Sequence, residues 1–238
     1  MNTVVTLQAI TLDLDDTLWP VWPTIARADA ALMAWLRAQA PTTAAAHTTR
    51  SMRLLRDAIA RERPEWAHDF SAIRLESIRR ALQAAGDDVA LAGPAFEVFF
   101  AERQRVDLFA DVLPALDRLA ARWPLVALSN GNADVQRVGL GRYFVASVSA
   151  REFGIGKPAA PIFHAACARV NAPPTAVLHV GDDPTLDVDG ALAAGLRAAW
   201  VQRLGLHEAS PMPVPAPPQG RPHHHVSDLA LLADQLGA

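Results

Sequence analysis

The chain has little cysteine, little tyrosine and no long apolar run. Its one cysteine, Cys167, excludes an internal disulfide, so the folded state must depend on its apolar interior. No apolar run approaches the ~20 residues that a membrane-spanning helix requires. No basic segment followed by a long apolar stretch stands near the start of the sequence. We therefore expect a cytoplasmic protein with no membrane partner.

An excess of positive charge is also lacking. The formal net charge is −3, whereas proteins that bind nucleic acid or anionic membranes chiefly by electrostatics have basic surfaces. Any phosphate group must then be bound by a local arrangement of side chains.

Hydrophobic residues make up 51% of the 238 positions, which is enough for one large domain or two smaller ones. We expect no nucleic acid partner, and either a monomer or a homodimer.

Apolar segments and helical patterns alternate along most of the chain. Residues 4–13 are rich in Val, Leu, Ile and Thr and predict a central strand that is covered on both faces. Further strands are predicted at 124–130, 143–150, 176–182 and 197–202. A helix is predicted to begin at about 113, and further helices are predicted at 135–139, 161–170, 190–194 and 226–236. Strands that alternate with helices indicate a parallel sheet. The predicted fold class is therefore α/β, with a doubly wound, mostly parallel Rossmann-like sheet.

The segment after the first strand has helical periodicity only. A proline and a glycine separate its amphipathic patterns. Helices are predicted at 24–40, 48–63, 70–85 and 94–107. We therefore predict an α-helical cap at 20–108, inserted into an α/β catalytic core formed by 1–19 and 109–238. A proline-rich surface loop is predicted at 210–222.

Carboxylates follow the first predicted strand directly. The stretch ITLDLDDTLWP places Asp13, Asp15 and Asp16 within four positions at the end of a buried segment. An unpaired carboxylate beside an apolar interior is costly, so the cluster implies a cation, a substrate or a solvated turn. In parallel α/β sheets, ligands bind outside the carboxyl ends of the strands. Other predicted strand ends and adjoining loops supply Ser129, Lys157, Asp182, Asp183 and Asp187.

The carboxylates suit phosphoryl transfer assisted by a metal ion. Asp13 and Asp15 share one face of extended chain, with Cα atoms ~6.5 Å apart. One carboxylate can attack phosphorus while the other transfers protons to and from oxygen. Four carboxylates would repel an anionic substrate, and an all-oxygen site of this kind suits Mg²⁺. The predicted metal ligands are Asp13, Asp15, Asp182 and Asp187.

The phosphate oxygens need donors that the carboxylates cannot provide. Lys157 supplies a positive charge, and Ser129 supplies a hydroxyl beside the backbone amides of Asn130 and Gly131. Taken alone, DLDDT is compatible with a polar turn and SNG with ordinary turn chemistry. The joint occurrence of complementary charges at successive strand ends favours a phosphate site.

Other polar residues have simpler explanations. Asp16 and Asp183 suit either the surface or a supporting position beside the metal, and both remain open as ligands. The triplet 223–225 of histidines would alternate faces in a strand, so we expect an edge strand or loop there and no metal site. His179 is expected to be a core histidine with a hydrogen-bond partner, and Cys167 a packing residue.

Four motifs, DLDDTLW, LSNGN, GKP and HVGDDPTLDVDGA, together resemble the haloacid dehalogenase superfamily of aspartate-nucleophile hydrolases. The resemblance implies a helical cap after the first strand. It implies a phosphatase as well, because the dehalogenases of the family lack the acid found here at Asp15 and need no metal. The implied roles are nucleophile for Asp13, general acid and base for Asp15, phosphate binding for Ser129 and Lys157, Mg²⁺ binding for Asp13, Asp182 and the Asp15 carbonyl, and the second acidic position of the last motif for Asp187.

The cap segment WAHDFSAIRLESIRR is similar to that of family members which act on phosphates of the riboflavin pathway and on FMN. It offers His68, Asp69 and Arg74 as candidate substrate-binding residues, although a solvated helix face with ordinary charges is the alternative. The expected partner is a small phosphate ester. A phosphomutase and a non-catalytic phosphometabolite-binding module remain as alternative functions.

Overall fold

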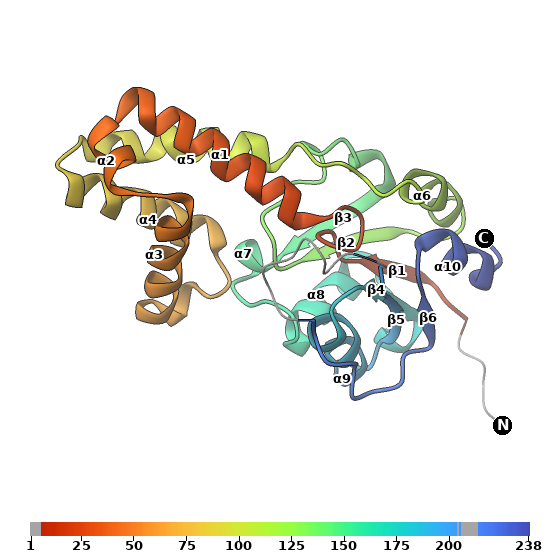
Figure 1. Cartoon of the computed structure of the whole chain (residues 1–238). Helices are drawn as coiled ribbons and strands as arrows, with labels where there is room; N and C mark the ends of the chain where they lie inside the picture. Colours follow the sequence, from red (N-terminus) through yellow and green to blue (C-terminus); the bar gives the residue numbers. More distant parts are fainter. Residues whose placement is uncertain (1–5, 204, 206–213) are drawn as a thin grey trace. The chain divides into compact units, whose positions relative to one another are not determined.

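The computed structural model describes residues 6–203, 205 and 214–238. The chain divides into two compact units (Figure 1). One unit combines Met1–Val21 with Asp107–Ala238, and the other consists of Trp22–Val106. The first residues of the first predicted strand and positions 210–213 of the predicted proline-rich loop lie outside the described residues.

The larger unit contains a six-stranded sheet in which every pair of neighbouring strands is parallel. The strands are β1 (Ala9–Leu12), β2 (Leu125–Ser129), β3 (Phe144–Ser149), β4 (Val177–Gly181), β5 (Arg197–Val201) and β6 (His224–Val226). Their order in the sheet is β3-β2-β1-β4-β5-β6. The predicted α/β class with a Rossmann-like sheet is confirmed, and the histidine triplet contributes to the edge strand β6.

Burial explains why the central strands have no polar face. All residues of β1, β2 and β4 are buried, because helices cover both faces of the sheet. Figure 1 shows α6 (Val112–Ala120) and α10 (Leu229–Leu236) on one side, and α8 (Ala160–Arg169) and α9 (Gly190–Ala193) on the other. The short helix α7 (Ala150–Phe153) follows β3. Single 3₁₀ turns occupy Pro64–Trp66, Val89–Leu91, Gly141–Tyr143 and Pro174–Ala176.

The helix predicted at 135–139 is wrong. The segment forms a turn, in which the amide of Val138 donates to the Asp134 carbonyl at 2.9 Å. The Asp134 carboxylate accepts from the amides of Gln136 and Arg137, and Gly139 adopts a φ of 83° that ends the turn. Four residues between a capping aspartate and a left-handed glycine are too few for a stable helix.

The second unit is entirely helical among its regular elements. Its helices are α1 (Val21–Gln39, which begins in the other unit), α2 (Pro41–Ala46), α3 (Thr49–Glu62), α4 (Phe70–Ala85) and α5 (Ala92–Arg103). They share an apolar core that includes Leu32, Leu36, Ile78, Leu82 and Phe99. A capping box at Thr48 begins α3, and a left-handed Gly86 ends α4. In the described part of the chain, no helix combines the length and apolar character needed to cross a bilayer.

Candidate active site

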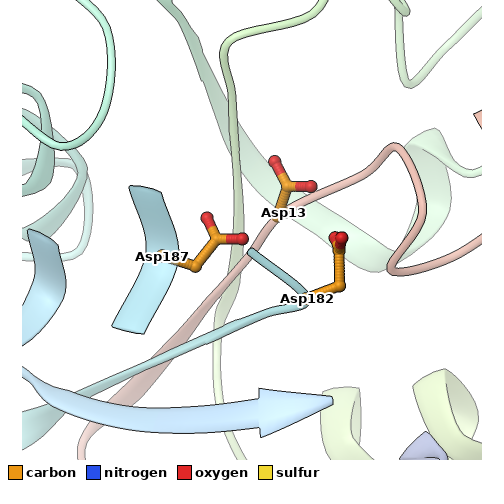
Figure 2. Close-up of side chains that lie close together, drawn as sticks. All are labelled: Asp13, Asp182 and Asp187. Atoms are coloured by element: carbon orange, nitrogen blue, oxygen red, sulfur yellow. The ribbon is translucent and has the colours of Figure 1, made fainter. Parts of the chain in front are cut away.

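Three carboxylates meet at the carboxyl ends of β1 and β4. Asp13 follows β1, Asp182 follows β4, and Asp187 lies one turn further, in a π-helical turn at Pro184–Asp189. One oxygen of each carboxylate lies within 4.8 Å of an oxygen of the others, and Figure 2 shows the three groups around one space. β1 and β4 are adjacent and parallel, so their ends deliver these side chains to one place.

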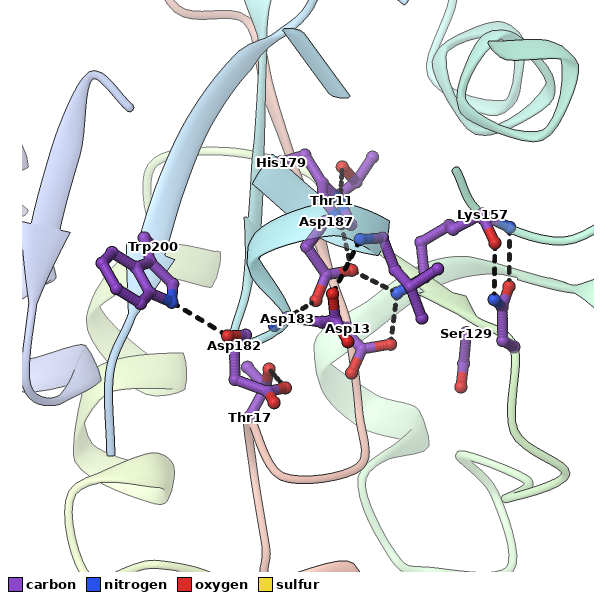
Figure 3. Close-up of polar contacts among 12 residues, drawn as sticks. Thr11, Asp13, Thr17, Ser129, Lys157, His179, Asp182, Asp183, Asp187 and Trp200 are labelled. Atoms are coloured by element: carbon purple, nitrogen blue, oxygen red, sulfur yellow. Dashed lines mark hydrogen bonds and ion pairs between the residues drawn. The ribbon is translucent and has the colours of Figure 1, made fainter. Parts of the chain in front are cut away.

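Lys157 joins two of the carboxylates. Its Nζ lies 2.5 Å from Oδ1 of Asp13 and 2.5 Å from Oδ1 of Asp187, and its side chain is buried (Figure 3). Burial alone would lower the pKa of Lys157, but the two adjoining carboxylates raise it above its usual value. Lys157 is therefore a fixed positive charge directly beside the predicted nucleophile.

Asp13 is buried and Asp182 is half-buried at this edge of the sheet. Burial raises the pKa of Asp13 to about 8 although Lys157 opposes the shift, and burial with the nearby Asp187 raises that of Asp182. Thr17 Oγ1 donates to Asp182 Oδ1 at 2.8 Å, and Trp200 Nε1 donates to the Asp182 carbonyl at 2.9 Å. The sequence pattern did not predict that Thr17 and Trp200 contact Asp182. The one feature that could have indicated Thr17 is its hydroxyl group within the acidic loop.

Asp187 accepts a hydrogen bond from Lys157 through its Oδ1. Its Oδ1 also lies 3.1 Å from His179 Nε2, and its Oδ2 accepts from the Asp183 amide at 2.9 Å. Burial opposes charge on Asp187, but Lys157 and His179 hold its pKa below the ordinary range. The Asp183 side chain accepts from the amides of Thr185 and Leu186 and so caps the turn. The predicted core position of His179 is confirmed.

Asp15, the predicted acid and base, is held on both sides. Trp19 Nε1 donates to Oδ1 of Asp15 at 2.9 Å, and a Cβ added at Gly131 would lie 2.3 Å from its Oδ2. Asp16 takes a different part: it has a φ of 59°, and its carboxylate accepts from the Val21 amide where α1 begins. Trp19 is fully buried, which gives Asp15 a rigid donor.

Ser129, Asn130 and Gly131 follow β2. The hydroxyl of Ser129, which is buried, accepts from the Gly131 amide at 2.9 Å. The Asn130 side chain donates to the Lys157 carbonyl at 2.8 Å and accepts from the Lys157 amide at 2.7 Å. Its amide group therefore fixes the backbone that carries Lys157, a function that the sequence pattern did not indicate.

Replacing Gly131 with alanine should lower kcat by roughly 10²-fold, because the new methyl group would displace the Asp15 carboxylate. The variant should retain the wild-type melting temperature within a few degrees. A Cβ at Gly93, in α5, would meet no atom within 4 Å, so Gly93→Ala is the control and should keep wild-type kcat. Unchanged kcat in Gly131→Ala would show that Asp15 needs no fixed position.

The three candidate residues of the helical unit have unequal surroundings. Asp69 caps α4 by accepting from the Ala72 amide at 2.9 Å, and His68 is half-buried. Arg74 is buried inside the unit, where it donates to Asp29 at 2.6 Å and lies 3.4 Å from the Phe99 ring centroid. Burial lowers the pKa of Arg74 to about 9. These contacts give Arg74 a stabilising position within its own unit, whereas the sequence offered it as a substrate-binding donor, with a solvated helix face as the alternative.

Arg74→Ala should destabilise the protein by about 3 kcal/mol, since removing one partner leaves the buried Asp29 with only the longer 3.5 Å contact to Arg56. Denaturant unfolding measures this. The control is Arg79→Ala, which removes an exposed ion pair with Glu76 on the same helix and should change stability little. A variant with wild-type stability and a lower kcat/KM for large substrates only would contradict this expectation. It would show that Arg74 takes part in substrate recognition.

The chain is similar in sequence to proteins of one known family. The family described as haloacid dehalogenase-like hydrolases matches residues 7–195. The 5-amino-6-(5-phospho-D-ribitylamino)uracil phosphatase YigB of Escherichia coli is 34% identical over 200 residues, which cover 82% of this chain and 84% of that protein. The phosphoserine phosphatase of Thermus thermophilus is 36% identical over 179 residues, covering 72% and 68%.

Solved structures give the same assignment. A crystal structure described as a 2-haloacid dehalogenase from Pseudomonas syringae is 36% identical, with a TM-score of 0.87 and coverage of 98% of this chain and 99% of that one. A HAD phosphatase from Thermococcus onnurineus has the same fold, with a TM-score of 0.68 at 19% identity and coverage of 97% and 98%. The resemblance predicted from the four motifs is confirmed. The chain belongs to the haloacid dehalogenase-like hydrolases.

Proposed function

We propose that the chain is a Mg²⁺-dependent phosphatase that hydrolyses a small phosphate ester in the cytoplasm through an aspartyl-phosphate at Asp13. One observation carries the proposal: Asp13 lies 2.5 Å from the buried Lys157 ammonium, and Asp15 stands two residues further along the same loop. Asp13 beside the Lys157 ammonium is suited to attack an anionic phosphorus centre. Asp15 supplies the proton transfers.

The reaction has two displacements. In the first, an Asp13 oxygen forms a bond to phosphorus while the ester oxygen departs and takes a proton from Asp15. In the second, Asp15 removes a proton from water, whose oxygen attacks phosphorus and releases Asp13 and inorganic phosphate. Lys157 and the Ser129 hydroxyl stabilise the negative charge on the phosphoryl oxygens. Trp19 keeps Asp15 in place through both steps.

The carboxylates fit a divalent cation. Burial raises the pKa of both Asp13 and Asp182, so the two can be ionised together at neutral pH only with added positive charge nearby. We assign Asp13, Asp182 and the Asp15 carbonyl to Mg²⁺. Asp187 already receives donors on both oxygens, so we assign it to holding Lys157. Bound Mg²⁺ would neutralise negative charge on the carboxylates and on the phosphoryl group.

Two relatives named as phosphatases support hydrolysis of a phosphate ester rather than displacement of a halide from carbon. The presence of Asp15 supports the same choice. Displacement of a halide needs no proton for the leaving group, whereas departure of an alkoxide does. The similarity to YigB makes a phosphate of the riboflavin pathway, or FMN, our first candidate substrate. Phosphoserine is the second, because of the Thermus relative.

Removal of metal should abolish turnover of an aryl phosphate, and Mg²⁺ should restore it. The protein is dialysed against EDTA and assayed with p-nitrophenyl phosphate before and after addition of Mg²⁺. The same assay with FMN, phosphoserine and 2-chloropropionate then ranks the substrate classes. Hydrolysis that is independent of metal, or halide release without phosphate release, would contradict the proposed function.

A further inference from the structure

A chain of buried polar contacts continues from Lys157 into the interior of the sheet (Figure 3). Oδ1 of Asp187 accepts from Lys157 and lies 3.1 Å from Nε2 of His179, whose Nδ1 lies 2.8 Å from Oγ1 of Thr11. Thr11 of β1 and His179 of β4 are directly paired across the two strands and are 0% and 1% exposed. Neither side chain has a part in the two displacements described above.

Hydrogen-bond chemistry determines where each proton lies in this chain. The His179 ring lies between a carboxylate and a hydroxyl, so a single N–H is sufficient for both contacts. The ionised Asp187 carboxylate can only accept hydrogen bonds, which places that hydrogen on Nε2. Nδ1 of His179 then accepts from the hydroxyl of Thr11. Each donor therefore points toward Asp187, and each member of the chain has a partner.

The surroundings leave His179 and Asp187 little room to move. The His179 ring packs edge-on against Phe163 of α8, with centroids 5.1 Å apart. A Cβ added at Gly181 would lie 2.2 Å from Cγ of Asp187, so the carboxylate packs against the end of β4 only because that position is glycine. The Asp183 amide fixes the second oxygen of Asp187 at 2.9 Å.

We propose that His179 and Thr11 are positioning residues for the phosphoryl-transfer site: they hold Asp187, and through it the Lys157 ammonium, in the orientation that faces Asp13. The inference rests on the proposed phosphatase function and extends it to two residues that touch neither substrate nor metal. Partners that orient metal-ligating groups through a hydrogen bond typically contribute 10- to 100-fold to activity, and we expect an effect of the same order for the partners of Asp187.

The first test measures kcat with p-nitrophenyl phosphate and Mg²⁺ for three variants. His179→Leu removes both hydrogen bonds and should lower kcat by roughly 10- to 100-fold. Thr11→Val removes one hydroxyl at nearly constant volume and should cost roughly 2- to 10-fold. His179→Gln keeps an amide donor for Asp187 and should recover most of the loss. The control His164→Leu removes a histidine that bonds the Ala194 carbonyl, and should retain wild-type kcat.

A double-mutant cycle with Lys157→Met separates positioning from structural support. If His179 acts through Lys157, then His179→Leu should change kcat by less than about twofold in the Lys157→Met background. The same full loss in both backgrounds, or wild-type kcat in His179→Leu itself, would overturn the inference. Should His179→Leu fail to fold, Thr11→Val completes the same cycle, and its loss of kcat should likewise disappear in the Lys157→Met background. A wild-type protein without phosphatase turnover would instead overturn the proposed function, and this inference with it.

Discussion

Asp13→Asn should abolish turnover, lowering kcat by roughly 10⁴-fold or more, because an amide cannot form the bond to phosphorus that a carboxylate forms. The effect should be the same for every phosphate ester, since the attacking atom is common to all of them. The measurement is kcat with p-nitrophenyl phosphate under saturating Mg²⁺. Asp117→Asn removes a carboxylate that is 63% exposed, and this control should behave as wild type. Near wild-type kcat in Asp13→Asn would end the proposed mechanism.

The fold of Asp13→Asn should be preserved, and its stability gives a second readout. Burial raises the pKa of Asp13 from 3.8 to about 8, so the folded state holds this proton more tightly than the unfolded state does. The stability of the metal-free wild type should therefore fall as pH rises from 3.8 to about 8. Asparagine cannot ionise, so the variant should show a smaller fall. Thermal unfolding in EDTA across this pH range checks the difference, and a steeper fall in the variant would contradict it.

Lys157→Met should lower kcat by roughly 10²- to 10³-fold, the loss expected when one donor to a developing oxyanion is removed. Methionine keeps much of the volume of the side chain but carries no charge. The ammonium also separates Asp13 from Asp187, with a contact of 2.5 Å to each, so its removal leaves two buried carboxylates without their shared cation. The metal-free variant should accordingly unfold at a lower temperature than wild type.

Added Mg²⁺ separates these two effects of Lys157→Met. A cation at Asp13 and Asp182 would recover part of the lost stability, because it replaces positive charge near the carboxylates. It should not recover kcat, because in the proposed mechanism the ammonium itself binds the phosphoryl oxygens. A variant whose kcat lies within twofold of wild type would show that Lys157 does not bind phosphate.

The positions of Asp13 and Asp182 could be predicted from the sequence for a physical reason. Buried parallel strands read as continuous apolar runs, and the first polar residues after such runs must lie at one edge of the sheet. The α/β fold follows from the same alternation of strands and helices. For these residues, spacing along the chain alone decides proximity in space.

Other contacts could not be predicted, because partner choice depends on packing between distant segments. Nothing in the SNG motif indicates that the Asn130 side-chain amide forms hydrogen bonds with the backbone of Lys157, 27 residues away. The indole of Trp200 reaches the Asp182 carbonyl only because β4 and β5 are neighbours. Arg74 stands in an amphipathic pattern that a solvated and a buried arginine satisfy equally well, and only its pairing with Asp29 decides between them.

Transfer of the phosphoryl group to Asp13 is tested most directly by a single turnover in ¹⁸O-labelled water. The reaction is quenched in acid, and both the released phosphate and the peptide that contains Asp13 are analysed by mass spectrometry. The mechanism predicts a transient phosphoryl group on that peptide and ¹⁸O in the released phosphate, because water attacks phosphorus and leaves both Asp13 oxygens in place. Incorporation of ¹⁸O into the Asp13 carboxylate would contradict the mechanism, since it would mean that water attacks the aspartyl carbon, as in hydrolysis of an ester formed with a carbon substrate.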